Sequence, residues 1–198
     1  MTAATRSGSA VRWTSADLAG FPDDGKRREI IDGELYVSRQ PNWYHQTVSG
    51  RIFAVLDEWS VRTGEGGASI APGLIFADDD DVAPDVVWAS TMRLSADLAQ
   101  GKLYAAPELA VEVLSPGTAN IRRDRETKRK LYTRRGVAEY WIIDWPRRII
   151  DIYRQSGGEL ILTHTLTDRD TLASPLLPGF SAALDRIFVG LPTEDAAE

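Results

Sequence analysis

The run of residues 108–114, ELAVEVL, carries a carboxylate in its apolar middle and is closed by the turn residues SPGT. Side chains alternate faces along a strand, so Glu112 shares its face with Ala110 and Leu114. An ionised carboxylate that faces a core without a partner is costly. Glu112 must therefore open into a cleft, pair with a cation or bind a metal ion, unless it lies at the end or edge of a sheet.

A second carboxylate, Asp85, opens the apolar run VVW directly after Pro84. An aspartate after a proline commonly marks the start of a strand, which is the plain structural interpretation. If the strands of Asp85 and Glu112 are neighbours, the two carboxylates form a hard-oxygen site suited to Mg²⁺ or Mn²⁺.

Residues 121–135 are strongly basic and predict a helix that stops at Gly136. Steps of three and four from Ile121 define one stripe of this helix: Asp124, Lys128, Leu131, Tyr132 and Arg135. Because Leu131 and Tyr132 must face the protein, Lys128 points inward and needs an anion such as Glu112. The alternative is a solvated helix surface laced by pairs four residues apart: Arg122–Glu126, Asp124–Lys128 and Glu126–Lys130.

Two carboxylates and a lysine together have the chemistry of phosphodiester hydrolysis. A divalent ion held by carboxylates lowers the pKa of bound water and neutralises phosphate charge. A lysine can orient or deprotonate the attacking water and stabilise the developing negative charge.

The remaining residues predict a mixed order of helices and strands, which fits an α/β or α+β protein. Asp32-Gly33 predicts a hairpin, and Asn42 is the expected N-cap of a long helix that ends near Gly64. The other predicted elements are a short helix capped by Thr14 or Ser15, a strand over 68–77, a solvated acidic turn at 78–81, a strand over 83–90, a loop with a little helix over 91–107, three strands over 138–144, 148–155 and 158–166, and a short terminal element over 177–188.

Composition excludes several classes of protein. With 198 residues, 43% of them hydrophobic, the chain suits one domain, which we place at 13–190 between a disordered N-terminus (1–12) and a polar tail (191–198). The lack of cysteine excludes disulfides and thiolate metal sites. No apolar run is long enough to span a membrane and no secretory signal is present, so we expect a cytoplasmic protein with no membrane partner.

Charge is unevenly distributed along the chain. The formal net charge is −6, which argues against a protein that coats nucleic acid through bulk charge. Residues 122–135, however, carry eight Lys/Arg against Asp124 and Glu126, a local charge of +6 that leaves −12 for the rest. One basic segment on an acidic body hints at an anionic ligand.

Three segments in this order, APDVVW, PELAVEVLSPGT and RDRETKRKLYTRRGVAEYWIID, resemble the Uma-two family of restriction endonucleases, within the PD-(D/E)XK nuclease superfamily. REIIDGELY and the helix start WYHQ match the N-terminal half of that family, so the resemblance covers residues 14–188. It implies an α/β (α+β) fold with a restriction-endonuclease-like mixed β-sheet flanked by helices.

The resemblance also implies roles for particular residues. Asp85 matches the aspartate of the PD element, and Glu112 matches the acidic residue of the (D/E)XK element. The chain departs from the pattern at Leu114, where the superfamily has lysine. In families of this kind the lysine is thought to come from the following helix, which gives Lys128 the catalytic role; Lys130 is the competitor, and the stripe favours Lys128.

Two residues in the N-terminal half match family motifs and are candidate accessory residues at the rim of the site. His45 is the first, although a histidine near a helix start is commonly a packed or capping residue. Glu29 is the second, and its plain interpretation is a solvated charge before the hairpin.

The function implied by the resemblance is a metal-dependent DNA endonuclease. Asp85 and Glu112 would hold Mg²⁺, with Mn²⁺ as an alternative. Arg122, Arg123 and Arg125 would lie near the DNA backbone. A homodimer stays open, because nucleases that cut both strands often use two sites. Two other functions also stay open: a catalytically silent nuclease-fold protein with a binding or regulatory role, and a metal-dependent hydrolase of a small phosphate ester.

Overall fold

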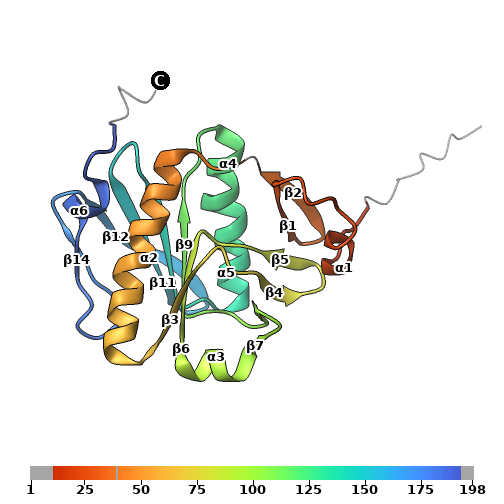
Figure 1. Ribbon diagram of the computed structural model, residues 1–198, viewed down its shortest axis with the longest axis horizontal. Helices are drawn as coiled ribbons and strands as arrows, with labels where there is room; N and C mark the ends of the chain where they lie inside the picture. The colour runs from red at the N-terminus through yellow and green to blue at the C-terminus, as the bar shows by residue number, and fades with distance from the viewer. Residues whose placement is uncertain (1–10, 39, 193–198) are drawn as a thin grey trace, which may run out of the picture.

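A six-stranded mixed sheet forms the centre of the protein, with helices on both faces (Figure 1). The computed structural model describes residues 11–38 and 40–192. From edge to edge the strands are β12 (Glu159–Thr167), β11 (Ile149–Ser156), β10 (Glu139–Asp144), β9 (Leu109–Val113), β6 (Val86–Ser90) and β3 (Gly66–Ile70). Strands β9 and β10 are parallel, and the other neighbouring pairs are antiparallel. The strands predicted over 138–144, 148–155 and 158–166 are confirmed as β10, β11 and β12.

Strand β9 is buried along its whole length because each face of the sheet meets a separate hydrophobic core. Leu109, Val111 and Val113 belong to one core, whereas Ala110 belongs to the other. This is the alternation that the sequence predicts, and it places Glu112 on the same side of the sheet as Ala110.

Helix α2 (Trp43–Thr63) covers the first face, as Figure 1 shows. It begins where the side chain of Asn42 accepts a hydrogen bond from the backbone N–H of His45, at 2.8 Å, and it ends at Gly64 in the left-handed conformation. Both predicted ends are therefore confirmed. The C-terminal elements β13 (Thr171–Leu172), β14 (Ala182–Ala183) and α6 (Leu184–Phe188) contribute to the same core.

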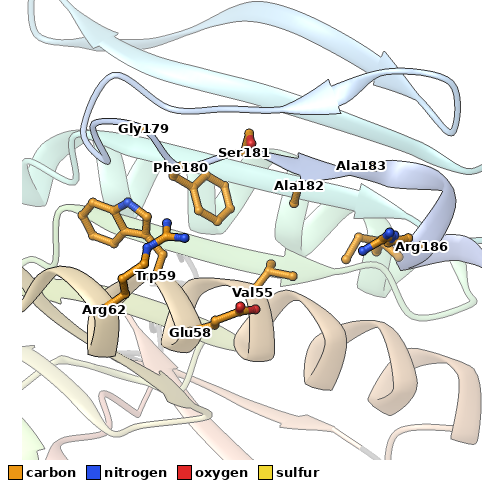
Figure 2. Close-up of a pocket in the computed structure, with 11 residues that line it drawn as sticks. Val55, Glu58, Trp59, Arg62, Gly179, Phe180, Ser181, Ala182, Ala183 and Arg186 are labelled. Atoms are coloured by element: carbon orange, nitrogen blue, oxygen red, sulfur yellow. The ribbon is translucent and has the colours of Figure 1, made fainter.

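A groove of about 230 Å³ follows the seam between α2 and the segment that carries β14. Figure 2 shows Trp59 beside Phe180 in this groove, with Arg62 and Arg186 toward its opposite ends. The Trp59 indole N–H donates to the backbone carbonyl of Pro178 at 3.2 Å, which fixes this segment against the helix.

The second face is covered by three helical segments in direct succession: α4 (Thr118–Arg122), the π-helical turn η1 (Arg123–Lys128) and α5 (Arg129–Arg135). Gly136, in the left-handed conformation, ends α5 as the sequence predicts. The π-helical turn was not predicted. Such turns are rare in proteins overall, and those that do occur are often found at functional sites.

Beyond α5 lies a second sheet, which Figure 1 shows on the far side of that helix from the central sheet. Its strands, in order, are β2 (Glu34–Ser38), β1 (Arg27–Ile31), β5 (Asp80–Val82), β4 (Leu74–Ala77), β8 (Lys102–Leu103) and β7 (Leu98–Ala99). The predicted hairpin joins β1 to β2, with Asp32 and Gly33 both at positive φ. Two short helices complete the fold: α1 (Ser15–Leu18), capped by Thr14, and α3 (Thr91–Asp97).

The single strand predicted over 68–77 is wrong. This stretch forms two strands, β3 in the central sheet and β4 in the second sheet. Between them Ala71 has a φ of 45° and is followed by Pro72-Gly73, so the chain turns out of one sheet and into the other. Gly66, at the start of β3, is required by packing, because a Cβ there would lie 2.3 Å from the carbonyl oxygen of Ala89.

The prediction of a solvated turn at 78–81 is wrong for its second half. Asp80 and Asp81 belong to β5 and are buried. Asp80 accepts hydrogen bonds from Arg134 and Arg135 at the end of α5 and from the backbone N–H of Asp32. Burial alone would raise the pKa of Asp80, but these donors together hold it below its usual range. This cluster attaches the second sheet to α5.

None of the helices in the described ranges is long and apolar enough to cross a membrane. The expected disorder of residues 1–12 and the polar tail at 191–198 lie mostly outside the described residues. Of the N-terminal segment, residues 11 and 12 are described, and Arg12 forms an ion pair with Asp79 at 2.7 Å.

Asp80→Asn should lower the free energy of unfolding by about 2 kcal/mol, because two arginines lose their shared carboxylate. We expect a smaller loss of unfolding free energy than for a fully buried ion pair, since both arginines are partly exposed. Urea denaturation followed by circular dichroism measures the change. Asp79→Asn is the matched control in the same acidic run, and its exposed pair with Arg12 should contribute less than about 1 kcal/mol. Equal losses in the two variants would contradict the attachment role of Asp80.

Candidate functional site

The two predicted carboxylates lie opposite each other on neighbouring strands. In the antiparallel pair β6–β9, Val86 lies opposite Val111 and Val87 lies opposite Ala110. Extending this register by one residue places Asp85 opposite Glu112. Directly opposed residues project to the same face with their Cβ atoms about 4.5–5.5 Å apart. The prediction that their strands are neighbours is therefore confirmed.

Asp85 is buried, and both of its carboxylate oxygens are engaged. Arg27 donates to Oδ1 at 2.8 Å, while Oδ2 accepts from the backbone N–H of Val113 at 2.9 Å and lies 3.1 Å from Nε2 of His45. Burial alone would raise the pKa of Asp85, but the hydrogen bond from His45 and the charges of Arg27 and Lys128 hold it well below its usual range. Asp85 is therefore an ionised carboxylate with a fixed orientation.

Glu112 is buried beside Asp85 and is held from the opposite side. Its Oε1 accepts from the ammonium of Lys128 at 2.8 Å and from the hydroxyl of Tyr132 at 2.9 Å. Burial raises the pKa of Glu112 to about 8, because the nearby Lys128 offsets the desolvation only in part and three other carboxylates add to the rise. Both hydrogen bonds go to Oε1, so Oε2 is the oxygen left for the pocket described below.

Lys128 is completely buried, with an exposed fraction of 0%. Its ammonium lies 2.8 Å from Glu112, 2.9 Å from Glu29 and 4.0 Å from Asp124. Burial would lower the pKa of Lys128, but these carboxylates outweigh it and raise the pKa above its ordinary value. The ammonium of Lys128 is thus enclosed by carboxylates in this arrangement, which favours an orienting role over deprotonation of the attacking water.

Strand β1 supplies two further charged residues on one face, Arg27 and Glu29, two positions apart. Both hold the backbone of Ala83: Glu29 accepts from its N–H at 3.0 Å, and Arg27 donates to its carbonyl at 3.1 Å. Ala83 lies two residues before Asp85. The second sheet therefore fixes the position from which Asp85 enters the site.

These residues surround a pocket of about 410 Å³. It is lined by charged and polar side chains from β1, α2, β9 and η1 and by the residue that precedes β6: Arg27, His45, Asp85, Glu112, Arg123 and Asp124. Val37, Pro41 and Asn42 complete one wall, and the turn Ser115-Pro116 completes another. Lys128 does not reach this pocket and lies behind Glu112. The groove of Figure 2 shares no lining residue with it.

The other candidate site residues, Lys130, Glu29 and His45, differ in their burial and contacts. Lys130 is exposed, so the stripe correctly distinguished it from Lys128. The solvated interpretation of Glu29 is wrong, because it is buried on Lys128. His45 is a packed residue: it is buried, its backbone N–H donates to the capping residue Asn42, and its imidazole contacts Asp85.

The three arginines predicted to contact DNA have different surroundings. Arg123 lines the pocket and donates to Ser38 at 2.7 Å. Arg122 is exposed and pairs with Glu126 at 3.1 Å. This is one of the surface pairs that the alternative interpretation predicted for this helix. Arg125 points away from the pocket, toward Asp151 at 2.7 Å and Asp144 at 3.7 Å.

Two contributors were missed by the sequence analysis. The hydroxyl of Tyr132 bonds to Glu112, although the stripe had placed that residue only in the core. Arg27 was not considered at all. Its signal in the sequence is its spacing, since Arg27 and Glu29 lie two residues apart in RREII and therefore share one face of a strand.

The donor set can be tested against the divalent ion that the sequence predicts. Within residues 11–38 and 40–192, no three His, Asp or Glu side chains form a ready-made metal cage. Mg²⁺, however, is commonly held by one or two carboxylates with water and phosphate oxygens completing its shell. The site also contains two buried polar atoms without a hydrogen-bond partner, Oε2 of Glu29 and Nδ1 of His45. Asp85 and Glu112 therefore fit an ion held by two carboxylates, and they do not fit a closed structural metal site.

The chain is similar to known proteins in both sequence and fold. A sequence profile of the family Uma2, described as "Putative restriction endonuclease", matches residues 16–185. Among curated proteins no match was found. A solved structure described as a "putative nuclease belonging to DUF820", from Anabaena variabilis ATCC 29413, is 16% identical with a TM-score of 0.70, and the match covers 88% of this chain and 97% of that one. This likeness shows the restriction-endonuclease-like fold that the sequence predicts.

A second solved structure, the type IIG restriction endonuclease BpuSI, is 14% identical with a TM-score of 0.39. The match covers 77% of this chain and only 17% of that much longer one. At this score the likeness carries no structural argument.

Lys128→Met should lower the free energy of unfolding by about 3–5 kcal/mol at neutral pH, because it leaves Glu29 and Glu112 buried without their shared cation. Lys130→Met is the matched control two residues away; as an exposed change it should stay within about 0.5 kcal/mol. Denaturant unfolding of both variants measures the difference. A Lys128→Met protein as stable as the wild type would show that the ammonium does not hold this site together.

Proposed function

The chain belongs to the Uma2 family, and from this premise we propose that it is a metal-dependent DNA endonuclease that hydrolyses phosphodiester bonds. The observation that carries the proposal is the pair Asp85 and Glu112, opposed across neighbouring strands at a polar pocket. A purely structural role would call for full pairing of both buried carboxylates, whereas both hydrogen bonds to Glu112 go to Oε1 and leave Oε2 for the pocket.

Asp85 and Glu112 would hold the ion, with Mg²⁺ as the first candidate and Mn²⁺ as the alternative. When bound, the ion supplies a lowered pKa for water and positive charge for the scissile phosphate. The second oxygen of Glu112 and the ionised Asp85 are the hard ligands that such an ion prefers.

The residues of the chain have separate tasks around that pair. Lys128 fixes Glu112 through a charged hydrogen bond and keeps Glu29 in place, so it acts as a positioning residue. His45 and the Val113 N–H fix Asp85 in the same way. Arg27 and Arg123 line the pocket, where their guanidinium groups can bind phosphate oxygens.

A catalytically silent protein with a binding or regulatory role is the second candidate. One observation favours it: both oxygens of Asp85 are already bound, by Arg27, His45 and the Val113 N–H. An ion at this carboxylate has to compete with those donors. A hydrolase of a small phosphate ester is the third candidate, because a pocket of about 410 Å³ lies in the range of small-ligand sites.

Supercoiled plasmid incubated with the wild-type protein and Mg²⁺ should be nicked or linearised, and EDTA should prevent it. Glu112→Gln should reduce the rate at least about 100-fold, because the amide keeps the size and the hydrogen-bond acceptor but lacks the charge that holds the ion. Gel electrophoresis over time gives the rates. Glu126→Gln, a change of the same kind at an exposed residue of η1, should cleave like the wild type.

Cleavage by Glu112→Gln at the wild-type rate would show that the assigned site is wrong. If the wild type leaves plasmid intact but hydrolyses a small phosphate ester such as bis-p-nitrophenyl phosphate, the third candidate replaces the first.

Calorimetric titration with Mn²⁺ separates the enzyme from the silent protein. We expect one ion to bind the wild type, with binding abolished in Asp85→Asn and in Glu112→Gln, because neither carboxylate alone gives a charged pair of ligands. Glu126→Gln should bind as the wild type does. No binding to the wild type, with DNA present or absent, would favour the silent binding role.

A further inference from the structure

We propose that the DNA taken by this pocket is single-stranded or locally unpaired, and that one of its bases stacks on the exposed indole of Trp43. The inference rests on the proposed function and extends it from the chemistry to the form of the substrate. Two independent observations carry it: the position of Trp43, and the pairing of the basic segment with the protein's own acids.

Trp43 is the first residue of α2 and has an exposed fraction of 81%, the highest among the exposed large hydrophobic residues. It directly follows Asn42 and lies two residues before His45, both of which line the pocket. The next aromatic residue, Tyr44, packs against Trp145 with their rings 5.2 Å apart. Tyr44 thus has an internal contact, whereas Trp43 presents its ring to solvent one residue after the pocket-lining Asn42.

The segment of the pocket lining that leads to Trp43 contains two apolar residues among the polar Ser38, Gln40 and Asn42. Val37, on β2, is half exposed and lines the pocket, and Pro41 lies between it and the start of α2. Arg27 and Arg123 line the same pocket; each pairs with one carboxylate, and its remaining N–H groups can bind a phosphate oxygen. An exposed aromatic ring near a pocket with partly buried cations is a combination with which proteins hold an unstacked nucleotide: the base on the ring and the phosphate on the cations.

The basic segment gives the second observation, because its charges are directed inward. Of its eight Lys/Arg, six form ion pairs with acidic residues of the chain: Arg122, Arg123, Arg125, Lys128, Arg134 and Arg135. A seventh, Arg129, lies over the ring of Tyr153 at 5.6 Å and donates to two backbone carbonyls.

A duplex is normally held by a row of free lysines and arginines along its phosphates, which makes its binding steeply dependent on salt. In this chain most of the charges that would form such a row are already paired, and the net charge is −6. Stacking on an aromatic ring needs no such row, but it does need a base that is not enclosed in a duplex. The two observations therefore favour an unpaired strand over a duplex.

The test is fluorescence anisotropy with a labelled 20-nucleotide single strand, the same strand annealed to its complement, and EDTA to prevent cleavage. The wild type should bind the single strand at least about fivefold more tightly than the duplex. Trp43→Ala should weaken single-strand binding roughly 5- to 150-fold, which corresponds to the stacking of one base. Trp43→Tyr, which keeps an aromatic face, should restore most of the affinity.

Val61→Ala is the matched control, because Val61 lies on the same helix with an exposed fraction of 79% and does not line the pocket. It should bind both DNA forms as the wild type does. Equal affinity of the wild type for single strand and duplex would overturn the inference, as would unchanged single-strand binding by Trp43→Ala. If Trp43→Ala binds the single strand as the wild type does but sediments with a lower mass than the wild type, a second copy of the chain covers Trp43 instead.

The plasmid assay keeps this failure separate from failure of the proposed function. Metal-dependent cleavage that disappears in Glu112→Gln, together with equal binding of both DNA forms, would overturn the single-strand inference and leave the nuclease standing. A wild type that neither cleaves nor binds any DNA would overturn both.

Discussion

The buried ammonium of Lys128 is the interaction on which the site depends. It joins Glu29 from the second sheet to Glu112 from the central sheet, and it comes from the π-helical turn that packs between them. Removing this charge from water is costly, and the two close carboxylates, together with Asp124 at 4.0 Å, offset the cost. The same contact explains why an apolar strand tolerates Glu112. The carboxylate forms an ion pair with a cation that the following helical segment places behind it.

Regular elements made part of this site predictable. Asp85 and Glu112 follow from strand alternation and from the register of adjacent strands, and Lys128 follows from the stripe of a helix, so each is fixed by local geometry. The contacts of Arg27 and Glu29 with Ala83 were not predictable in this way. They depend on how a second sheet packs against the first, and β4 belongs to that second sheet because the chain turns at Ala71, where the sequence had predicted a continuous strand.

Charge shows the limit of sequence reasoning more sharply. Along the chain, residues 122–135 look like a basic patch on an acidic body. In the folded protein the two parts complement each other, because the acids that carry the remaining negative charge, such as Asp80 and Asp151, are the partners of these arginines. A local excess of charge therefore indicated internal pairing at least as much as an anionic ligand. Only the fold could distinguish these interpretations, since the partners are 26 to 55 residues apart in sequence.

The site itself is left with more negative than positive charge. Four carboxylates meet there, from Glu29, Asp85, Glu112 and Asp124, against three cations, Arg27, Arg123 and Lys128. A cluster selected for stability alone would be balanced, because an uncompensated buried charge destabilises the fold and apolar residues would fill the space at less cost. The excess is reflected in the raised pKa of Glu112, because burial and the carboxylates of Asp85, Asp124 and Glu29 disfavour its charged form. This imbalance agrees with the proposed divalent ion, which would bring positive charge to the two carboxylates.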